Sequence, residues 1–264
     1  MAALVIGILV WGLMFWTFAF HRKKKNSPLY PKQTKENLPL ELVYTAVPFV
    51  MVAILFYFAV TTENYVLKNV ANPDVKVKVT AFKWGWDFGY EDSKSPDALT
   101  ANDPTVHTLG SATQVPVLVL PINKTIQYTL ESRDVIHSFW VIDFNFKRDV
   151  FPSPKANNTQ NVFQNVIDVP GAMVGRCAEL CGTYHSSMNF EVRAVPQNVY
   201  EEYLQLRQQK NPATGKGYTA AEALTKTGND IPTCKELCAP LATSTYPINP
   251  NREAKSATLR AGGN

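Results

Sequence analysis

Residues 75–81 read VKVKVTA, in which apolar and polar residues alternate with a period of two. Such alternation is typical of a β-strand with one buried face. Five further segments with strand composition follow, separated by clusters of Pro and Asn: 115–120 (VPVLVL), 124–130 (KTIQYTL), 136–142 (IHSFWVI), 162–168 (VFQNVID) and 189–194 (NFEVRA). Several short strands with turn signals between them predict a β-sandwich or a Greek-key barrel.

Two other parts of this region do not have strand composition. Residues 91–114 are polar and predict a long surface insertion. After Pro196, the tyrosines and leucines of VYEEYLQLRQQ (199–209) share one face, which predicts a helix. From about residue 211 the chain is rich in Pro, Thr and Ala, and we expect this tail to wrap over a surface or a partner.

The N-terminal part predicts two membrane-spanning helices. Residues 2–20 carry no charge, and residues 38–60 carry only Glu41, so each approaches the length of about 20 apolar residues that a span needs. Pro48 is tolerated inside such a helix. The alternative is a buried helical hairpin of a soluble protein. The first span lacks the basic region and the cleavage site of a secretory signal. Either the natural chain starts here or an upstream segment is missing, and we favour the second alternative.

The charge of the chain is concentrated between these spans. The 264 residues are 45% hydrophobic and 18% charged, which excludes disorder of the whole chain. The mean hydropathy of −0.13 argues against a bundle made only of membrane helices. The net charge is +4, but residues 21–37 alone hold six basic residues against one acid. The rest of the chain therefore offers no basic surface for nucleic acid.

Basic residues in a short loop mark the cytoplasmic side of a membrane. We therefore expect residues 1–62 to form a hairpin whose loop, 21–37, is cytoplasmic. Residues 63–200 then form an extracytoplasmic β-domain with the insertion at 91–114, and residues 201–264 form a C-terminal helix and an extended tail. We expect the chain to be a multi-pass protein of the cell membrane, with both of its ends on the extracytoplasmic side.

The segment 177–188, CAELCGTYHSSM, carries the chemistry. Cys177, Cys181, His185 and Met188 place thiolate, imidazole and thioether groups within twelve residues, a donor set that suits copper. Two thiolates can bridge two metal ions, which then need a second imidazole. His137 is the obvious donor, because the other two histidines, His21 and His107, fall in the cytoplasmic loop and in the polar insertion.

Two other interpretations of this segment remain open. A disulfide between Cys177 and Cys181 is compatible with an oxidising compartment, but it leaves His185 and Met188 unexplained. A structural zinc site uses Cys and His ligands, but it rarely uses a thioether.

The pattern C-x-E-x-C-G-x-x-H-x-x-M, after an upstream H-S-F, resembles the dinuclear copper (CuA) site of cytochrome c oxidase subunit II. The chain is similar to actinobacterial members of that family over about residues 1–200. The resemblance implies a cupredoxin-like fold in which Cys177 and Cys181 bridge two coppers. The other ligands that it implies are His137, His185, Met188 and the backbone carbonyl of Glu179. It also implies a magnesium ion, shared with subunit I, beside the Glu179 carboxylate, and haem only in partner subunits.

The aromatic stretch 82–88 (FKWGWDF) also matches the family, and the resemblance assigns Trp84 as the residue that receives electrons from cytochrome c. Taken alone, two tryptophans at i and i+2 are more often a packing feature. Asp134 is expected either to belong to an acidic surface that docks the donor or to be a solvated acid at a strand end.

Glu41, seven residues before Pro48, resembles the cytoplasmic entrance of the K proton pathway; the alternative is an interfacial side chain that reaches water. Asp149 matches the family's Lys-x-Asp stretch and is expected to help connect to the magnesium region. Two positions depart from the family: Phe139 stands where many relatives have Trp, and Pro152 is followed by Ser153 where Pro-Gly is common.

The resemblance implies subunit II of an aa3-type cytochrome c oxidase, which relays electrons to subunit I for reduction of oxygen to water coupled to proton pumping. The implied partners are subunits I and III, membrane lipid and a cytochrome c donor. The insertion and the tail suggest that this donor is a membrane-bound dihaem cytochrome c of a bc1-type complex, in a supercomplex.

Three alternatives are weighed against this function. A quinol-oxidase subunit II shares the hairpin and the fold but lacks the copper ligands. A membrane-anchored dinuclear copper-binding or copper-delivery protein outside an oxidase would need neither Trp84 nor Glu41 nor the Glu179 carboxylate. A nitrous oxide reductase domain shares the metal motif but would not need the hairpin.

Cys234 and Cys238 repeat the Cys-x-x-x-Cys spacing, but no His or Met follows at the required offsets. On a helical turn their Cα atoms would lie about 6 Å apart, within the range of a disulfide. We therefore predict a disulfide that holds the tail locally in an oxidising compartment.

Overall fold

The computed structural model describes residues 1–30, 33, 35–97, 103–110 and 114–242. The chain divides into two compact units, residues 1–63 and 64–264. Lys32 of the basic loop, parts of the predicted insertion and the end of the predicted tail lie outside the described residues.

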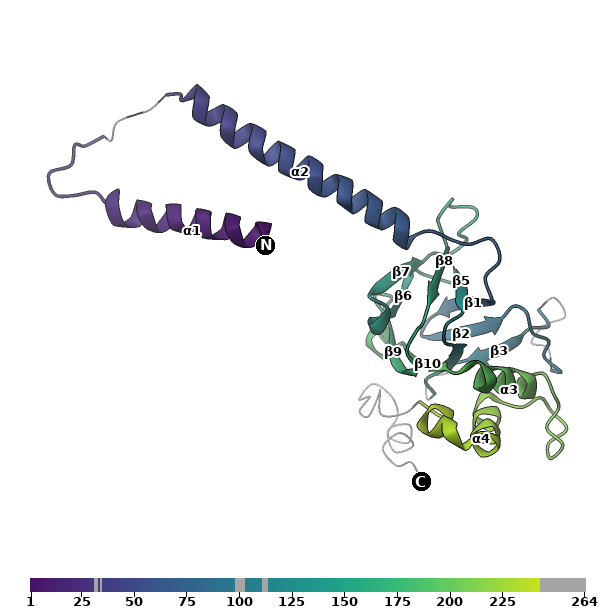
Figure 1. The fold of residues 1–264 in the computed structure, drawn as a ribbon. Helices are drawn as coiled ribbons and strands as arrows, with labels where there is room; N and C mark the ends of the chain where they lie inside the picture. The colour runs from purple at the N-terminus through teal and green to yellow at the C-terminus, as the bar shows by residue number, and fades with distance from the viewer. Residues whose placement is uncertain (31–32, 34, 98–102, 111–113, 243–264) are drawn as a thin grey trace. The chain divides into compact units, whose positions relative to one another are not determined.

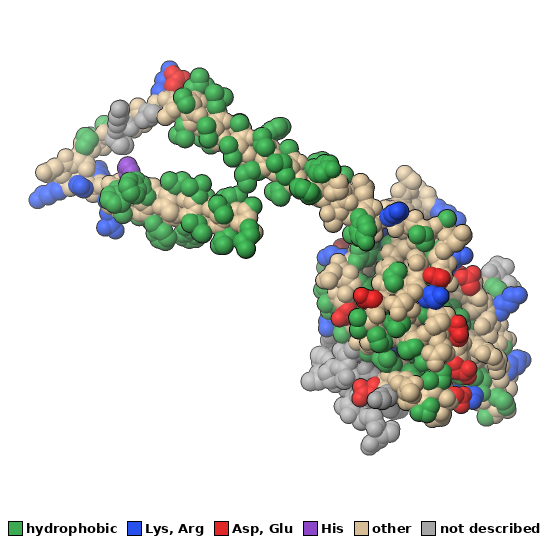
Figure 2. Space-filling view, viewed as in Figure 1, with side chains coloured by type: hydrophobic (Ala, Val, Ile, Leu, Met, Phe, Trp, Pro, Cys, Tyr) green, Lys and Arg blue, Asp and Glu red, His purple; other side chains and the backbone are tan. Residues whose placement is uncertain are grey.

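The first unit contains two helices, α1 (Ala2–Phe20) and α2 (Leu38–Val66), and both are long and apolar enough to cross a membrane. No residue of either helix is buried in the structure, so their apolar side chains are exposed all round. Figure 2 shows these hydrophobic side chains along both helices, with Lys and Arg in the segment that joins them. A helix that is apolar on every side is typical of a lipid environment.

Glu41 lies in the first turn of α2, where its carboxylate accepts a hydrogen bond from the backbone N–H of Asn37 at 2.9 Å. The Asn37 side chain accepts one in return from the N–H of Leu40 at 3.4 Å. This exchange satisfies donors that would otherwise be unpaired at the helix start. Pro48 lies inside α2.

The second unit is a β-sandwich of two five-stranded sheets (Figure 1). The first sheet has the order β3-β2-β1-β5-β8 and contains β1 (Val75–Phe82), β2 (Gly85–Tyr90), β3 (Val106–Leu109), β5 (Thr125–Ser132) and β8 (Val162–Val166). The second has the order β4-β10-β9-β6-β7 and contains β4 (Val117–Pro121), β6 (His137–Val141), β7 (Phe146–Val150), β9 (Gly171–Cys177) and β10 (Asn189–Val195).

Within each sheet one pair of strands is parallel, β1 with β5 and β4 with β10, and the other pairs are antiparallel. The core between the sheets is aromatic. Trp86 packs edge-on against Phe139 and Phe190, and Tyr128 stacks on Phe163. This rigid core fixes the ends of the strands from which the candidate site is built. The predicted architecture, two apolar helices followed by a mainly β domain with sandwich topology, is therefore confirmed.

Part of the predicted surface insertion belongs to the first sheet. Within residues 91–114, Val106–Leu109 form β3, which pairs antiparallel with β2. Val106 and Thr108 are buried, and the His107 side chain is only 8% exposed. The expectation of a surface loop was wrong here, because hydrogen bonds to β2 bury a short strand in an otherwise polar segment.

The C-terminal part also contains more structure than predicted. α3 (Gln197–Arg207) is followed by α4 (Ala220–Asp230) and by a 3-10 helix, η3 (Pro232–Cys238). α3 starts before residue 200, contacts β4 and belongs to the same compact unit as the strands. Thr219 and Glu222 form a capping box at the start of α4. No such helix was predicted.

η3 contacts β10, and Cys234 and Cys238 form a disulfide within it, with Cα atoms 5.6 Å apart. Arg193 of β10, fully buried, donates hydrogen bonds to the carbonyls of Leu237 (2.9 Å), Ala239 (2.8 Å) and Leu241 (2.6 Å). Arg193 also pairs with the buried carboxylate of Glu191. Besides this packing, one guanidinium group thus supplies three hydrogen bonds that fasten the end of the described chain to β10.

Candidate metal centre

The segment that carries the predicted ligands connects the end of β9 to the start of β10. Backbone hydrogen bonds close it at its base: the N–H of Cys177 donates to the carbonyl of Met188 at 3.2 Å, and the N–H of Ala178 donates to that of Ser138 at 3.0 Å. The N–H of Met188 donates to the carbonyl of His185 at 3.2 Å. These bonds hold the segment against β6, whose first residue is His137.

The five side-chain donors converge at this base. The sulfur atoms of Cys177 and Cys181 are 3.8 Å apart. His137 Nδ1 lies 3.8 Å from the Cys177 sulfur, and His185 Nδ1 lies 3.5 Å from the Cys181 sulfur. The Met188 sulfur lies 3.8 Å from that of Cys181.

One backbone group joins these side chains, because the carbonyl oxygen of Glu179 lies 3.2 Å from the Cys177 sulfur. The structure therefore brings together every predicted ligand of a dinuclear site. Cys177, Cys181, His137 and Met188 are buried, and His185 is half-buried. A pair of free thiols flanked by two imidazoles and a thioether suits a soft metal ion rather than a hard one.

The pKa shifts of these groups keep their side chains uncharged when no metal ion is bound. Burial, together with the adjacent Cys177, raises the pKa of Cys181 to about 12. Burial also lowers the pKa of His137, although Asp134 opposes this effect. Thus at neutral pH the apo site holds a neutral thiol at Cys181 and favours a neutral imidazole, and a metal cation supplies the charge that stabilises a thiolate.

Asp134 orients His137. Its Oδ1 lies 2.8 Å from His137 Nε2, which leaves Nδ1 facing the sulfur atoms. Its Oδ2 accepts a hydrogen bond from the backbone N–H of Lys83 at 2.8 Å. The Asp134 side chain is 27% exposed, so it is neither a fully solvated acid nor free of partners. Such a carboxylate–histidine pair is typical of metal sites, where it fixes the imidazole tautomer.

Trp84 lies beside the segment. Its Nε1–H donates to the carbonyl of Cys181 at 3.1 Å, and its ring meets that of Tyr184 edge-on at 5.0 Å. Gly182 makes this approach possible: its φ is +113°, and a Cβ there would lie 3.2 Å from the indole ring. The indole is half-buried, so one part of it faces the outside while its N–H contacts the site.

Trp86 is the second indole of the same stretch. It is fully buried, and its Nε1–H donates to the carbonyl of Met188 at 3.2 Å. Both indoles therefore bond to backbone carbonyls of the ligand segment, Trp84 to that of Cys181 and Trp86 to that of Met188, its last residue. The sequence alone did not reveal this role of Trp86 or the role of Asp134, although an acid three residues before a candidate ligand is a signal that could have been used.

Other predicted functional residues lie outside this group. The side chains of Glu179 and Asp149 are exposed, as are those of Leu180 and Tyr184. Glu41 belongs to the first compact unit.

The family model for the periplasmic domain of cytochrome c oxidase subunit II matches residues 75–195. A probable cytochrome c oxidase subunit 2 from Nocardia farcinica is 47% identical, over 97% of this chain and 77% of its own length. The cytochrome c oxidase subunit 2 of Mycobacterium tuberculosis is 41% identical, over 95% of this chain and 76% of its own length.

Among solved structures, the periplasmic domain of subunit II of cytochrome oxidase from Bradyrhizobium japonicum matches this chain with 24% identity and a TM-score of 0.43. The match covers 52% of this chain and 95% of that domain.

Proposed function

Because the chain belongs to the cytochrome c oxidase subunit II family, whose members are part of a haem–copper oxidase, we propose that it carries electrons from cytochrome c to subunit I. The convergence of six donor groups from residues 137 and 177–188 carries this proposal. When bound there, a dinuclear copper centre would supply a one-electron carrier whose charge is shared by two ions.

The residues fit that centre. Cys177 and Cys181 would bridge the two ions, and His137 and His185 would each bind one of them. Met188 and the carbonyl of Glu179 would complete the set. The β-sandwich holds these donors on strand ends and on backbone hydrogen bonds, so little movement accompanies a change of charge.

Trp84 is the proposed point of electron arrival. Its N–H is one hydrogen bond from the backbone of Cys181, and its ring contacts the exposed Tyr184 (53%). Leu180, which is 77% exposed, directly precedes Cys181. An exposed apolar area beside a redox site is suited to a transient partner. Because Asp134 is already bonded to His137 and to Lys83, we assign it to orienting the ligand rather than to docking the donor.

The remaining assignments concern the partners. The exposed carboxylate of Glu179 would bind magnesium shared with subunit I, with Asp149 nearby in the assembly. Glu41 would lie at the cytoplasmic entrance of a proton pathway, and α1 and α2 would span the cell membrane with the β-domain outside. The haem groups, oxygen reduction and proton pumping belong to subunit I; subunit III and a membrane-bound dihaem cytochrome c would complete the assembly.

Electron paramagnetic resonance of the copper-loaded full chain tests the site. We expect a mixed-valence signal in which one unpaired electron is shared equally by two copper nuclei. A signal from a single copper nucleus would contradict the dinuclear assignment.

The role of Trp84 is tested in the assembled oxidase with Trp84→Leu. We expect the copper signal to persist and the reduction of copper by cytochrome c to slow severely, because the aromatic path to Cys181 is lost. Trp140→Leu is the matched control, since Trp140 is also a partly exposed tryptophan, on β6. An unchanged reduction rate in Trp84→Leu would exclude this residue as the point of arrival.

A further inference from the structure

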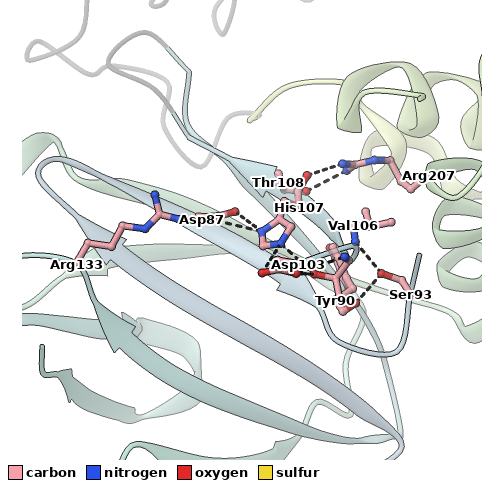
Figure 3. Close-up of polar contacts among 10 residues, drawn as sticks. Asp87, Tyr90, Ser93, Asp103, Val106, His107, Thr108, Arg133 and Arg207 are labelled. Atoms are coloured by element: carbon pink, nitrogen blue, oxygen red, sulfur yellow. Dashed lines mark hydrogen bonds and ion pairs between the residues drawn. The ribbon is translucent and has the colours of Figure 1, made fainter. Parts of the chain in front are cut away.

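A second group of ionisable side chains lies on the outer face of the first sheet (Figure 3). Trp86, Phe88 and Tyr90 of β2 point into the core, so Asp87 points to the opposite face. Its carboxylate is nevertheless only 1% exposed. It contacts His107 Nδ1 at 3.0 and 3.1 Å, and its Oδ2 lies 3.5 Å from the guanidinium of Arg133.

The other nitrogen of His107 faces a second carboxylate. His107 Nε2 lies 3.2 Å from Asp103 Oδ2 and 3.0 Å from the hydroxyl oxygen of Thr105. The Thr105 hydroxyl donates its own proton to Asp103 Oδ1 at 2.6 Å, so its oxygen is left to accept from Nε2. Nδ1 faces a carboxylate and must donate as well. Both ring nitrogens therefore carry protons, which makes the ring an imidazolium.

The sheet is shaped to receive this ring. Gly89 is paired with His107 across β2 and β3, and a Cβ at Gly89 would lie 2.9 Å from the ring carbon Cε1. The ring therefore packs directly on the backbone of β2, in a position that any other residue at 89 would obstruct. One strand further, Lys78 is paired with Gly89, and its ammonium group is bonded to Glu131 at 3.2 Å.

The same strand is held from the helical side by Arg207 of α3. Its guanidinium donates to the carbonyl of His107 at 2.5 Å, to the hydroxyl of Thr108 at 3.0 Å and to that of Tyr203 at 2.9 Å. These bonds do not depend on the charge of the imidazole. The bonds to Asp87 and Asp103 do, because a neutral imidazole has only one N–H.

We propose that Asp87, His107 and Asp103 form a proton-operated clasp, in which the doubly protonated ring fastens residues 103–109 to β2 and loss of one proton loosens them. The proposal does not depend on copper or on the oxidase assignment. None of these three residues is a proposed metal ligand, and Arg133 links the clasp to the turn that precedes His137.

The electrostatics agree with this geometry. The hydrogen bond to Asp87 raises the pKa of His107, and Asp103 adds to the effect, whereas burial opposes it. A histidine whose pKa is raised by folding stabilises the folded state fully below its ordinary value of about 6.5. This stabilisation is lost as the pH rises through the higher, folded-state pKa. The clasp therefore closes in acid and opens toward alkaline pH.

Hydrogen–deuterium exchange at the imidazole carbon, followed by mass spectrometry, measures the titration of each histidine in the full chain. In the copper-loaded protein His137 and His185 are ligands, so His21 and His107 remain to be compared. We expect the midpoint of His107 to lie above that of His21, and Asp103→Asn to lower it. A midpoint at or below that of His21 would overturn the proposal.

Backbone amide exchange tests whether titration moves the strand. At about pH 5.5, residues 103–109 should exchange faster in His107→Gln than in the unaltered chain, by about tenfold for each unit by which the pKa is raised; by about pH 8.5 the two should converge. His21→Gln is the matched control and should change nothing. Equal protection in His107→Gln and the unaltered chain at the lower pH would overturn the proposal. If His107→Gln does not fold, Asp103→Asn, at a more exposed position, gives the same comparison with a smaller difference.

Discussion

The segments Cys177–Cys181 and Cys234–Cys238 share one spacing, yet the first keeps two thiol groups with sulfur atoms 3.8 Å apart and the second forms a disulfide. The first begins at the end of β9 and is closed by backbone bonds to Ser138 of β6 and to Met188, whereas the second lies in a 3-10 helix. The spacing alone therefore does not decide what a pair of cysteines does. The groups that surround each pair decide it.

Those surroundings have opposite character. Around Cys177 and Cys181 lie two imidazole nitrogens, a thioether and a carbonyl oxygen, all of which can donate electron pairs to a metal ion. Near Cys234 and Cys238 the carbonyls of residues 237, 239 and 241 are already occupied by the guanidinium of Arg193. A fixed cation that uses the available oxygens disfavours a metal ion at the second pair.

The largest effect should come from Cys181→Ser, which removes one of the two thiolates proposed to bridge the metal ions. We expect the dinuclear copper signal to disappear, and turnover of the oxidase with cytochrome c to collapse while the haem groups of subunit I remain. The control is the double variant Cys234→Ser/Cys238→Ser, which should keep the signal. If the delocalised signal survived in Cys181→Ser, the ligand assignment would be wrong.

Arg193→Met should show how strongly the second segment depends on its cation. The change leaves the buried carboxylate of Glu191 without its guanidinium partner and removes three bonds to backbone carbonyls. Breaking a buried ion pair from one side costs about 3–5 kcal/mol, to be measured as a lower free energy of unfolding in denaturant. Lys226→Met removes an exposed pair with Asp230, which water and salt screen, so its effect on the free energy of unfolding should be far smaller. Comparable losses in the two variants would refute the clamping role.

Asp134→Asn should weaken the first segment without destroying it. Loss of the carboxylate that orients His137 lowers metal affinity by about 10–100-fold at comparable sites. Copper competition against a chelator of known affinity measures this change. Asp143→Asn, at an exposed acid in the turn after β6, is the control. An unaltered copper affinity in Asp134→Asn would show that His137 is held by packing alone.

The smallest effect should come from removal of the disulfide. Cys234→Ser/Cys238→Ser opens a very short loop, so its stabilisation lies at or below the low end of the usual range, about 2 kcal/mol. The midpoint of thermal unfolding should fall by a few degrees. Alkylation of the unaltered, copper-loaded protein without reductant gives the complementary measurement: labelling of Cys234 and Cys238 would contradict the disulfide.

The sequence predicted the strands whose alternation is regular and whose neighbours are turn residues, such as 75–81 and 124–130. It did not predict β2, in which all six residues, including Asp87 and two glycines, are buried. β1 and β3 flank this strand, and α3 packs against its last residue, Tyr90. β9 reads GAMVGRC and lacks a clear period. Tertiary pairing, rather than local preference, makes both segments strands.

The candidate site divides in the same way. Its sulfur and imidazole donors were predictable because their chemistry is contained in residue type and spacing. In the second group of ionisable side chains, the contact of Asp87 with His107 was not predictable, since the two residues are twenty apart and meet only through the β2–β3 ladder. His107 had been assigned to a polar surface loop, where composition alone gives no indication of a buried partner. For α4, by contrast, the sequence does hold a signal: the spacing of Thr219 and Glu222 is typical of a capping box and predicts the start of a helix.

The parallel pairing of β4 with β10 has a consequence for biogenesis. A ribosome delivers the chain from the N-terminus, and among the described residues β10 is the last strand to appear, some seventy residues after β4. Until β10 docks, the carbonyl of Met188 cannot close the base of the ligand segment, and Arg193 has no carbonyls to hold until residues 237–241 follow. The proposed metal centre therefore cannot form before β10 has been made and has docked, so copper would have to bind after this strand is in place.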